Sequence, residues 1–367
     1  MKINFLDLNA QYLSIKAEID SSIAQVISTS SFVLGPSVTK FEQDFARFCQ
    51  CDDAIAVNSG TSALFLTLKA LGIGDGDEVI TAANTFIATA AAVIYTGATP
   101  ILVDVDPVTR NIDLAKIESA ITSKTKALLP VHLYGCMVDM DRINAIARKH
   151  NLIVLEDACQ AHGAMFKNKA AGSYGRAGAF SFYPGKNLGA YGEGGAITTS
   201  DKELAREIRK LRDHGSEKKY YHDIIGYNAR MEGIQGAVLY VKLRHLSDWN
   251  KERNRVAARY REKLAGLPAI CPSEFKDFYQ VYHVFAIEIE NRDKLQEFLK
   301  ENGIPTLIHY PIPIHNQKAY QDAGFDGGQY PVTEKLSRRI LSLPIYPELT
   351  NEQVDYISSK IKEFFGR

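Results

Sequence analysis

Short apolar runs alternate with longer amphipathic stretches between about residues 53 and 200. The runs are short enough and apolar enough to predict strands, and the stretches between them, such as residues 61–71 and 139–150, carry apolar side chains at helical spacing. A chain that alternates strand and helix in this way builds a mostly parallel sheet. The seven predicted strands span residues 54–57, 77–81, 100–105, 126–133, 152–157, 179–183 and 195–200.

The pattern changes after residue 234. Residues 234–267 carry little turn chemistry before Gly266, which predicts one long helix that connects the sheet to a second layer. Residues 281–290 then predict a strand, residues 292–303 a helix, and residues 304–310 another strand. We therefore expect a large α/β domain over residues 1–245 and a smaller α+β domain over residues 246–367.

Composition narrows the possible classes of protein. The chain has 367 residues, of which 46% are hydrophobic and 23% charged, as in a soluble globular enzyme. Its 43 basic and 43 acidic residues cancel, so charge gives no reason to expect a nucleic-acid or membrane partner. The five cysteines are scattered and include no C-x-x-C pair, which favours reduced thiols and no metal site. No apolar run is long enough to cross a membrane, so we expect a cytoplasmic protein.

The sequence AFSFYPGKNLGAYGEGGAI, residues 179–197, places Lys186 between an aromatic-proline turn and a run of glycines. A phosphate-binding loop of a nucleotide triphosphatase has four residues between its glycines and a Ser or Thr after its lysine. Here six residues separate Gly178 from Gly185, and Asn187 follows the lysine. Lys186 therefore needs another explanation.

Other polar groups follow the predicted strands, where ligands bind in sheets of this type. Asp157 and Gln160 follow one strand, although an acid there can also cap a helix. Gly60 and Thr61 lie between a strand and a helix, where they fit a phosphate or serve in ordinary capping. Phe86 follows a third strand, either as a core residue or as a flat surface for a ligand.

Pyridoxal 5'-phosphate needs these groups together: a lysine for its aldehyde, a carboxylate for its ring nitrogen, an anion site and a stacking partner. The segments that contain them resemble, in order and over essentially the whole chain, the DegT/DnrJ/EryC1/StrS family of sugar aminotransferases. The resemblance implies the fold of fold-type I pyridoxal-phosphate transferases, with a large mixed, mostly parallel seven-stranded sheet domain. The motifs are NSGTSAL, TFIATAAAV, LEDACQAHGA, FSFYPGKNLGAYGEGGAI, RDHG, GYNARMEGIQGAVL and HYPIPIH.

The resemblance also implies roles for single residues. Lys186 is expected to form the Schiff base and move protons, and Asp157 to pair with the ring nitrogen. An unperturbed lysine amine has a pKa of about 10.4, so burial must lower it before Lys186 can act as a base. Asn228 is expected to reach the phosphate of the neighbouring subunit, which implies a homodimer with shared active sites. The remaining expected cofactor contacts are Gly60, Thr61 and Ser181 with the phosphate, Phe86 with the ring and Gln160 with the phenolic oxygen.

For the substrate, the resemblance implies a nucleotide-linked keto sugar, with L-glutamate and 2-oxoglutarate as amino donor and product. Residues 214–239 look more similar to enzymes that aminate C3 of a 3-keto-6-deoxyhexose, here expected to be dTDP-linked, in deoxysugar biosynthesis than to the 4-keto branch. Amination of a 4-keto sugar and a cofactor-binding regulator remain as alternatives, while Lys186 argues against the related dehydratases, which carry His there. The nucleotide and the stereochemistry stay open. Residues expected to bind the sugar nucleotide, or else to serve in packing, are Tyr183, Lys219, Tyr221, Arg230, His309, Tyr310 and His315.

Overall fold

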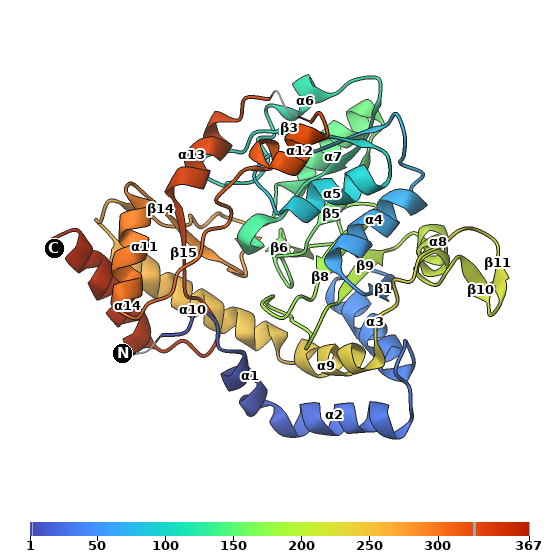
Figure 1. Cartoon of the computed structure of the whole chain (residues 1–367), viewed down its shortest axis with the longest axis horizontal. Coiled ribbons are helices and arrows are strands. Elements are labelled where there is room, and N and C mark those ends of the chain that lie inside the picture. Colours follow the sequence, from blue (N-terminus) through green and yellow to red (C-terminus); the bar gives the residue numbers. More distant parts are fainter. Residues whose placement is uncertain (2, 326–327, 367) are drawn as a thin grey trace.

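A computed structural model describes residues 1, 3–325 and 328–366 of the chain, with a seven-stranded sheet at its centre (Figure 1). The strand order is β1-β9-β8-β5-β4-β2-β3. Strand β9 runs antiparallel to β8 and β1, and all other neighbours are parallel. The predicted mixed, mostly parallel sheet is therefore confirmed. Its strands are β1 (Asp53–Val57), β2 (Glu78–Ala82), β3 (Thr99–Val103), β4 (Thr125–Leu129), β5 (Ile153–Asp157), β8 (Ala177–Ser181) and β9 (Gly195–Thr199).

Helices cover both faces of the sheet, and strand β1 shows how its residues divide between them. Ala54 and Ala56 pack in one hydrophobic cluster, whereas Ile55 and Val57 pack in the other. Strands buried on both faces read as continuous apolar runs, which is why the sequence predicted them. On the first face lie α3 (Pro36–Phe48), α7 (Met140–His150) and α9 (Gly233–Leu243), and on the second lie α4 (Gly60–Ala70), α5 (Ile87–Tyr95) and α8 (Lys202–Arg212).

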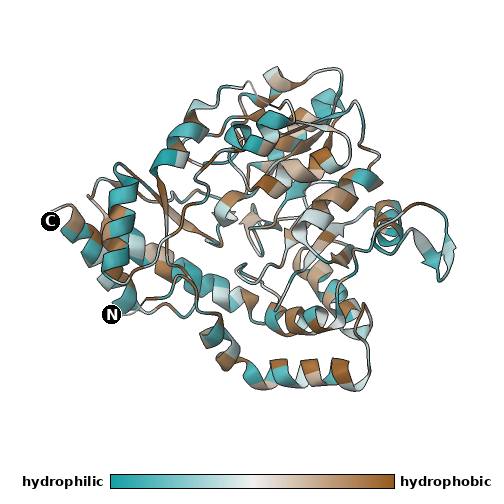
Figure 2. Ribbon diagram, viewed as in Figure 1, coloured by the Kyte–Doolittle hydropathy of each residue, from teal (hydrophilic) through white to brown (hydrophobic). Residues whose placement is uncertain are grey.

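The C-terminal part has its own small sheet, with strand order β12-β14-β15. Its hydrophobic cluster also includes Ile3 from the N-terminal segment, and both chain ends lie beside it in Figure 1. The outer helices are polar on their exposed sides, as the mostly teal α11 in Figure 2 shows. The boundary near residue 246 remains a proposal. The elements are β12 (Ala269–Ile270), β14 (Phe285–Ile289), β15 (Ile340–Leu343), α10 (Leu246–Leu264), α11 (Arg292–Glu301), α13 (Pro331–Arg339) and α14 (Asn351–Phe364).

The predicted single helix over residues 234–267 is wrong, because α9 and α10 are separate helices that follow one another end to end (Figure 1). Arg244 and His245 lie between them and both bind the Glu18 carboxylate, at 2.7 Å and 3.1 Å. Their backbone N–H groups donate to carbonyls three residues earlier, which ends α9 in a tight turn. Neither residue is a Gly or Pro, so the local sequence gives no sign of the break.

The predicted strand over residues 304–310 is also wrong. Only Leu307 forms a bridge there, to Ser342 of β15. Pro305 precedes it and Pro311 follows the segment, and prolines cannot donate to a strand ladder.

The remaining elements are short, apart from one N-terminal helix. None of the helices in the described part of the chain combines the length and apolar character that a bilayer crossing requires. A small hairpin, β10 and β11, projects from the right side of the molecule in Figure 1. These elements are α1 (Leu8–Ser14), α2 (Lys16–Ser28), α6 (Ile117–Ala120), β6 (Met165–Phe166), β7 (Lys169–Ala170), β10 (Ser216–Lys218), β11 (Tyr221–His222), β13 (Phe278–Tyr279), α12 (Lys318–Asp322), η1 (Leu133–Gly135) and η2 (Ile314–Asn316).

Candidate active site

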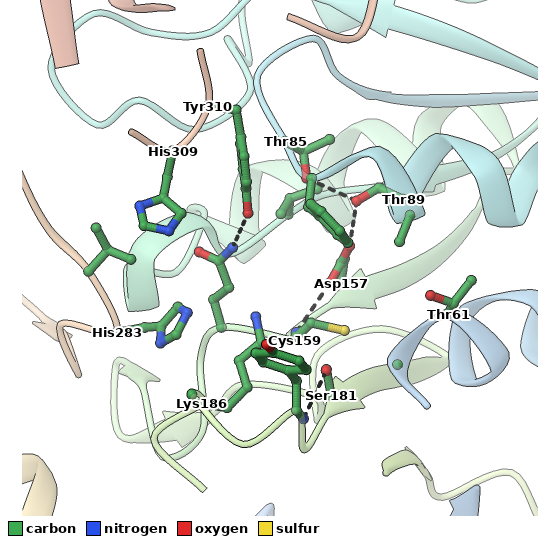
Figure 3. A pocket seen from close by; sticks show the side chains of 18 of the residues that line it. Thr61, Thr85, Thr89, Asp157, Cys159, Ser181, Lys186, His283, His309 and Tyr310 are labelled. Carbon is green, nitrogen blue, oxygen red and sulfur yellow. Dashed lines mark hydrogen bonds between the residues drawn. The ribbon is translucent and has the colours of Figure 1, made fainter. Parts of the chain in front are cut away.

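A cavity of about 680 Å³ lies at the ends of β5 and β8, between the central sheet and the C-terminal part. Figure 3 shows that its side chains come from segments far apart in the sequence. Its apolar wall and few convergent polar groups are typical of a small-molecule site. The sequence-predicted residues that line it are Gly60, Thr61, Phe86, Asp157, Gln160, Ser181, Tyr183, Lys186, His309 and Tyr310.

Asp157 is the last residue of β5 and its carboxylate is held from two sides. Thr89 Oγ1 donates to Asp157 Oδ2 at 2.7 Å, and the Cys159 backbone N–H donates to Oδ1 at 3.2 Å (Figure 3). Thr89 is itself bonded to Thr85, at 2.9 Å between the two hydroxyls. Asp157 as a residue is only 4% exposed. A buried carboxylate fixed in this way can hold a cationic nitrogen in one orientation.

Lys186 lies in the loop that follows β8. Its backbone N–H donates to Tyr183 O at 2.9 Å, and the next residue, Asn187, donates to both Asn250 Oδ1 and Val281 O. No other described residue forms a hydrogen bond or ion pair with the Lys186 amine. Burial lowers the pKa of this amine below its ordinary value, and nearby Cys159 and Asp157 oppose the shift. The lysine thus has the lowered pKa that a base or nucleophile needs.

The rest of this loop is fixed by close backbone packing. A Cβ at Gly189 would lie 2.2 Å from Pro184 O, so only glycine fits there. Lys242 of α9, which is 1% exposed, donates to Gly189 O at 2.8 Å and lies 4.4 Å from the centre of the Tyr191 ring. Burial lowers the pKa of Lys242 to about 8. These contacts fix the loop that carries Lys186.

The start of α4 forms a concave site for an anion. Ser59 caps the helix by accepting from Ser62 N at 3.0 Å, which leaves the N–H groups of Gly60 and Thr61 with no acceptor among the described residues. A Cβ at Gly60 would lie 2.6 Å from Ser181 Cβ, so the glycine lets β8 approach the helix start. Free N–H groups and the helix dipole favour a negative group there.

The opposite wall combines an amide with aromatic rings. Gln160 Oε1 accepts from the backbone N–H of Tyr134 at 2.7 Å, and its Nε2 donates to the Tyr310 hydroxyl at 3.1 Å. Burial raises the pKa of Tyr310, so this hydroxyl keeps its proton. Phe86 is 51% exposed and lies 5.6 Å from the Tyr310 ring, between centroids, so its face is available to a flat ligand.

Three histidines surround the lysine without adding charge. Burial lowers the pKa of His162 to about 3 and that of His309 to about 4, and the nearby charge of Lys186 adds to both shifts. The pKa of His283 is lowered well below its ordinary value by the same two causes. These rings are neutral at pH 7, so they offer hydrogen bonds rather than a positive field.

Five predicted residues lie outside the cavity lining in this chain. Lys219 and Tyr221 are exposed on the β10–β11 hairpin, while Arg230 pairs with Asp213 at 3.0 Å and donates to Asn228. The His315 ring packs on Tyr330, 4.6 Å between centroids, and its Nε2 is 3.5 Å from Glu334. The substrate role predicted for His315 thus has no support from its position. The five are Asn228, Lys219, Tyr221, Arg230 and His315.

The sequence did not single out several residues of the cavity. Thr89 lies within a quoted motif, but its contact with Asp157, 68 residues away in sequence, depends on tertiary packing. Phe5 and Leu6 come from the N-terminal segment, which carries no local sign of function. Arg253 on α10 and Glu193, between Gly192 and Gly194, also line the cavity. Phe5, Leu6 and Arg253 reach the site through tertiary packing alone.

The donor set fits pyridoxal 5'-phosphate. An unpaired lysine amine, a fixed carboxylate, an open helix start narrowed by Gly60 and an exposed aromatic face meet in one cavity of sufficient size. In this arrangement Lys186 would bond the aldehyde, Asp157 would pair with the ring nitrogen, and Gly60, Thr61 and Ser181 would hold the phosphate.

Residues 13–362 match the model of the DegT/DnrJ/EryC1/StrS aminotransferase family. The chain is 47% identical over 368 residues to a Geobacillus stearothermophilus protein named a pleiotropic regulatory protein, covering 100% of this chain and 99% of that protein. It is 45% identical over 367 residues to the dTDP-3-amino-3,4,6-trideoxy-alpha-D-glucose transaminase of Streptomyces venezuelae, covering 100% of this chain and 97% of the relative.

Two solved structures have the same fold and carry reaction-related ligands. The crystal structure of S. venezuelae DesV in complex with a ketimine intermediate has a TM-score of 0.97 and 45% identity, covering 100% of this chain and 99% of that one. The crystal structure of ntda from Bacillus subtilis with bound cofactor PMP has a TM-score of 0.94 and 35% identity, covering 100% and 86%. The present chain therefore belongs to the DegT/DnrJ/EryC1/StrS family and is a pyridoxal 5'-phosphate-dependent sugar aminotransferase of fold type I.

Proposed function

We propose that the enzyme transfers the amino group of L-glutamate to the C3 carbonyl of a dTDP-linked 3-keto-6-deoxyhexose. The observation that carries the chemistry is the unpaired, partly buried Lys186 amine in a cavity where Asp157 is held in one orientation. Support for C3 comes from relatives of 40% identity or more whose names place the nitrogen or the oxo group at that carbon, on dTDP- and UDP-linked sugars.

Bound pyridoxal 5'-phosphate supplies an electron-withdrawing ring that stabilises the carbanion formed when a substrate carbon loses its proton. Lys186 Nζ takes the α-proton of glutamate in the first half of the reaction. In the second half the same amine returns a proton to the sugar carbon that receives nitrogen. Its lowered pKa lets the neutral amine exist near neutral pH.

Asp157 keeps the ring nitrogen protonated, because a carboxylate held by Thr89 and Cys159 cannot turn away from it. The Gly60 and Thr61 N–H groups and the Ser181 hydroxyl would hold the phosphate in the cavity that Lys186 also lines. Gln160, held by the Tyr134 backbone N–H and the Tyr310 hydroxyl, would contact the phenolic oxygen of the ring.

The sugar nucleotide enters beside Tyr183, His309 and Tyr310. Tyr183 is 56% exposed at the cavity mouth, so its ring is available to a sugar or a base. Because the His309 ring is neutral at pH 7, it serves a sugar hydroxyl better than a diphosphate.

We propose a homodimer in which Asn228, Lys219, Tyr221 and Arg230 complete the partner's site. Tyr221 is 62% exposed and Asn228 is also exposed, so both are free to meet a second chain. Mixing Lys186→Ala and Asn228→Ala subunits tests this directly. Shared sites give heterodimers with one intact site and restored activity, and unrestored activity in confirmed heterodimers contradicts sharing.

The position of amination is tested by running the reaction backwards with 2-oxoglutarate. The proposal expects loss of 3-amino-6-deoxyhexose nucleotides and formation of glutamate. If only 4-amino sugar nucleotides react, the C4 alternative holds and the C3 assignment is wrong.

A regulatory role is the second candidate, because a relative at 47% identity is named a pleiotropic regulatory protein. A protein that only senses the cofactor binds it without converting glutamate. Glutamate-dependent formation of pyridoxamine phosphate, followed by absorbance, separates the two functions.

A further inference from the structure

We propose that the buried pair His132 and Glu156 positions Asp157 against the ring nitrogen of the cofactor. Neither residue lines the cavity, so both act through Asp157 and are positioning rather than catalytic residues. The inference rests on the proposed role of Asp157. Among the described residues, His132 and Glu156 form the one fully buried His–Glu contact, and neither side chain takes part directly in the chemistry of the cavity.

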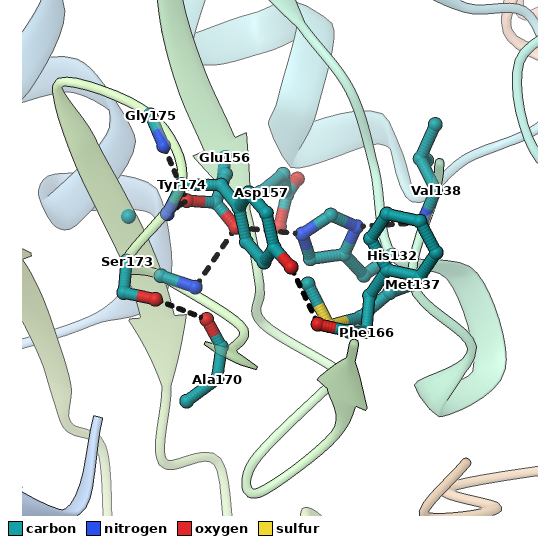
Figure 4. A network of polar contacts seen from close by, with 12 residues as sticks. His132, Met137, Val138, Glu156, Asp157, Phe166, Ala170, Ser173, Tyr174 and Gly175 are labelled. Carbon is teal, nitrogen blue, oxygen red and sulfur yellow. Dashed lines mark hydrogen bonds and ion pairs between the residues drawn. The ribbon is translucent and has the colours of Figure 1, made fainter. Parts of the chain in front are cut away.

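Glu156 precedes Asp157 in β5, so its side chain points to the opposite face of the sheet. All four acceptor positions of its carboxylate are used (Figure 4). Oε1 accepts from Tyr174 N and Gly175 N, both at 2.7 Å, and Oε2 accepts from Gly172 N at 2.9 Å and from His132 Nε2 at 2.9 Å. The residue is 0% exposed. A buried carboxylate with four donors is rigid, because any turn leaves a donor unpaired.

The hydrogen of the His132 ring is fixed at Nε2. The Val138 backbone N–H donates to His132 Nδ1 at 3.2 Å, so that nitrogen carries a lone pair (Figure 4). Nε2 then carries the hydrogen and donates it to Glu156. The ring is 0% exposed and has no other polar partner in the described structure. Through these two hydrogen bonds, the ring links Val138, in the segment after β4, to Glu156 of β5.

His132 also binds Asp157 through its backbone. Its N–H donates to Asp157 O at 3.0 Å, and Asp157 N donates to Pro130 O at 2.9 Å. One residue thus holds two consecutive residues of β5, Glu156 by its side chain and Asp157 by its main chain. These bonds fix the position and the orientation of the end of β5, from which the Asp157 carboxylate enters the cavity.

The same carboxylate fixes the loop before β8. Gly172, Tyr174 and Gly175 donate to Glu156, and the strand that follows them ends at Ser181 in the anion site. Glu156 therefore fixes how far β8 is shifted along its axis relative to β5. That shift sets the distance between Ser181, proposed for the phosphate, and Asp157, proposed for the ring nitrogen.

The test compares three variants of the full chain. His132→Phe fills the volume but removes both polar atoms, whereas His132→Gln keeps one donor and one acceptor. Asp104→Asn is the control, because Asp104 is a buried carboxylate, 3% exposed, that accepts from Val332 N and Thr333 N and does not line the cavity. The measurements are the thermal midpoint without cofactor, the dissociation constant of pyridoxal 5'-phosphate, and the pH at which the visible absorbance of bound cofactor changes.

We expect His132→Phe to weaken cofactor binding by roughly tenfold or more and to shift the absorbance transition, since small misplacements of a positioned group have large effects. His132→Gln should stay within about threefold of wild type, and Asp104→Asn should change only the thermal midpoint. If His132→Phe does not fold, His132→Leu, which also lacks both polar atoms, replaces it with the same expectation. Wild-type affinity and an unmoved transition in the Phe or Leu variant overturn the inference.

Asp157→Asn separates this inference from the function on which it rests. If Asp157→Asn shifts the transition and His132→Phe does not, the positioning role of His132 and Glu156 is wrong and the role of Asp157 stands. If Asp157→Asn leaves the transition unchanged, the proposed pairing of Asp157 with the ring nitrogen is itself wrong.

Discussion

Gly60 offers a sharp test of the anion site, because its missing side chain sets the distance between α4 and β8. In Gly60→Ala the new Cβ would lie 2.6 Å from Ser181 Cβ, 3.0 Å from Cys159 Sγ and 3.1 Å from Ser181 Cα. Two of the three atoms belong to the end of a central strand, which cannot rotate away. The start of the helix must therefore shift by several tenths of an ångström.

The cost follows from crowding in a packed site. An extra methyl group in a close-packed region lowers the free energy of unfolding by about 1–3 kcal/mol. The same shift separates the Gly60 and Thr61 N–H groups from Ser181, which are proposed to hold the cofactor phosphate together. A loss of about 1.4–2.8 kcal/mol in binding corresponds to a dissociation constant raised roughly 10- to 100-fold.

The assay is a titration of the apoenzyme with pyridoxal 5'-phosphate, followed by visible absorbance, together with urea unfolding. Gly74→Ala is the matched control, because the nearest atom to its new Cβ, Thr96 O, would be 3.5 Å away, an ordinary contact. We expect Gly74→Ala to bind the cofactor like wild type. If Gly60→Ala also binds like wild type while its stability falls, the phosphate does not bind at the start of α4.

Three further predictions concern the cavity and the Lys186 loop beside it. Thr89→Val keeps the shape but removes the 2.7 Å bond to Asp157, so urea unfolding of the holoenzyme should show a loss of about 1.5–3 kcal/mol, and an unchanged curve contradicts the support role. Burial lowers the pKa of Lys242 to about 8 in the folded protein, so above pH 8 the unfolded chain binds more protons than the folded chain. The free energy of unfolding should therefore rise from pH 8 to 10, by at most about 1.4 kcal/mol per pH unit. Lys242→Met should remove that rise, and a variant with the same pH slope refutes the assignment. Tyr310→Phe removes the bond to Gln160, so kcat/KM should fall by about tenfold at most while the cofactor still binds, and loss of the cofactor would contradict a role limited to the cavity wall.

The central sheet was predictable because its strands are buried on both faces and read as apolar runs between amphipathic helices. The break between α9 and α10 was not, because Arg244 and His245 are ordinary helical residues and Glu18, which binds both, is more than 200 residues earlier. Near Leu307 the apolar pattern predicted a strand, although Pro305, which cannot donate to a strand ladder, argued against it.

The residues of the site also divide into those that the sequence predicted and those that it did not. Asp157 follows a predicted strand and Gly60 lies between a predicted strand and a helix, so the rule that ligands bind at the carboxyl ends of strands already pointed to both. Ser181 was expected only from the family resemblance. Thr89, Phe5 and Leu6 reach the cavity only through packing between distant segments, which no local pattern reports. His315 lies outside the cavity lining of this chain, and a motif rich in His and Tyr does not say which of its rings face the cavity and which pack on Tyr330.

The most direct test of the account is to locate the cofactor on the chain. Holoenzyme reduced with borohydride and digested should carry a phosphopyridoxyl group on the peptide that contains Lys186, and Lys186→Ala should carry none. The label on another lysine, such as the buried Lys242, or no label after incubation with excess pyridoxal 5'-phosphate, would contradict the assignment of Lys186 and the chemistry built on it.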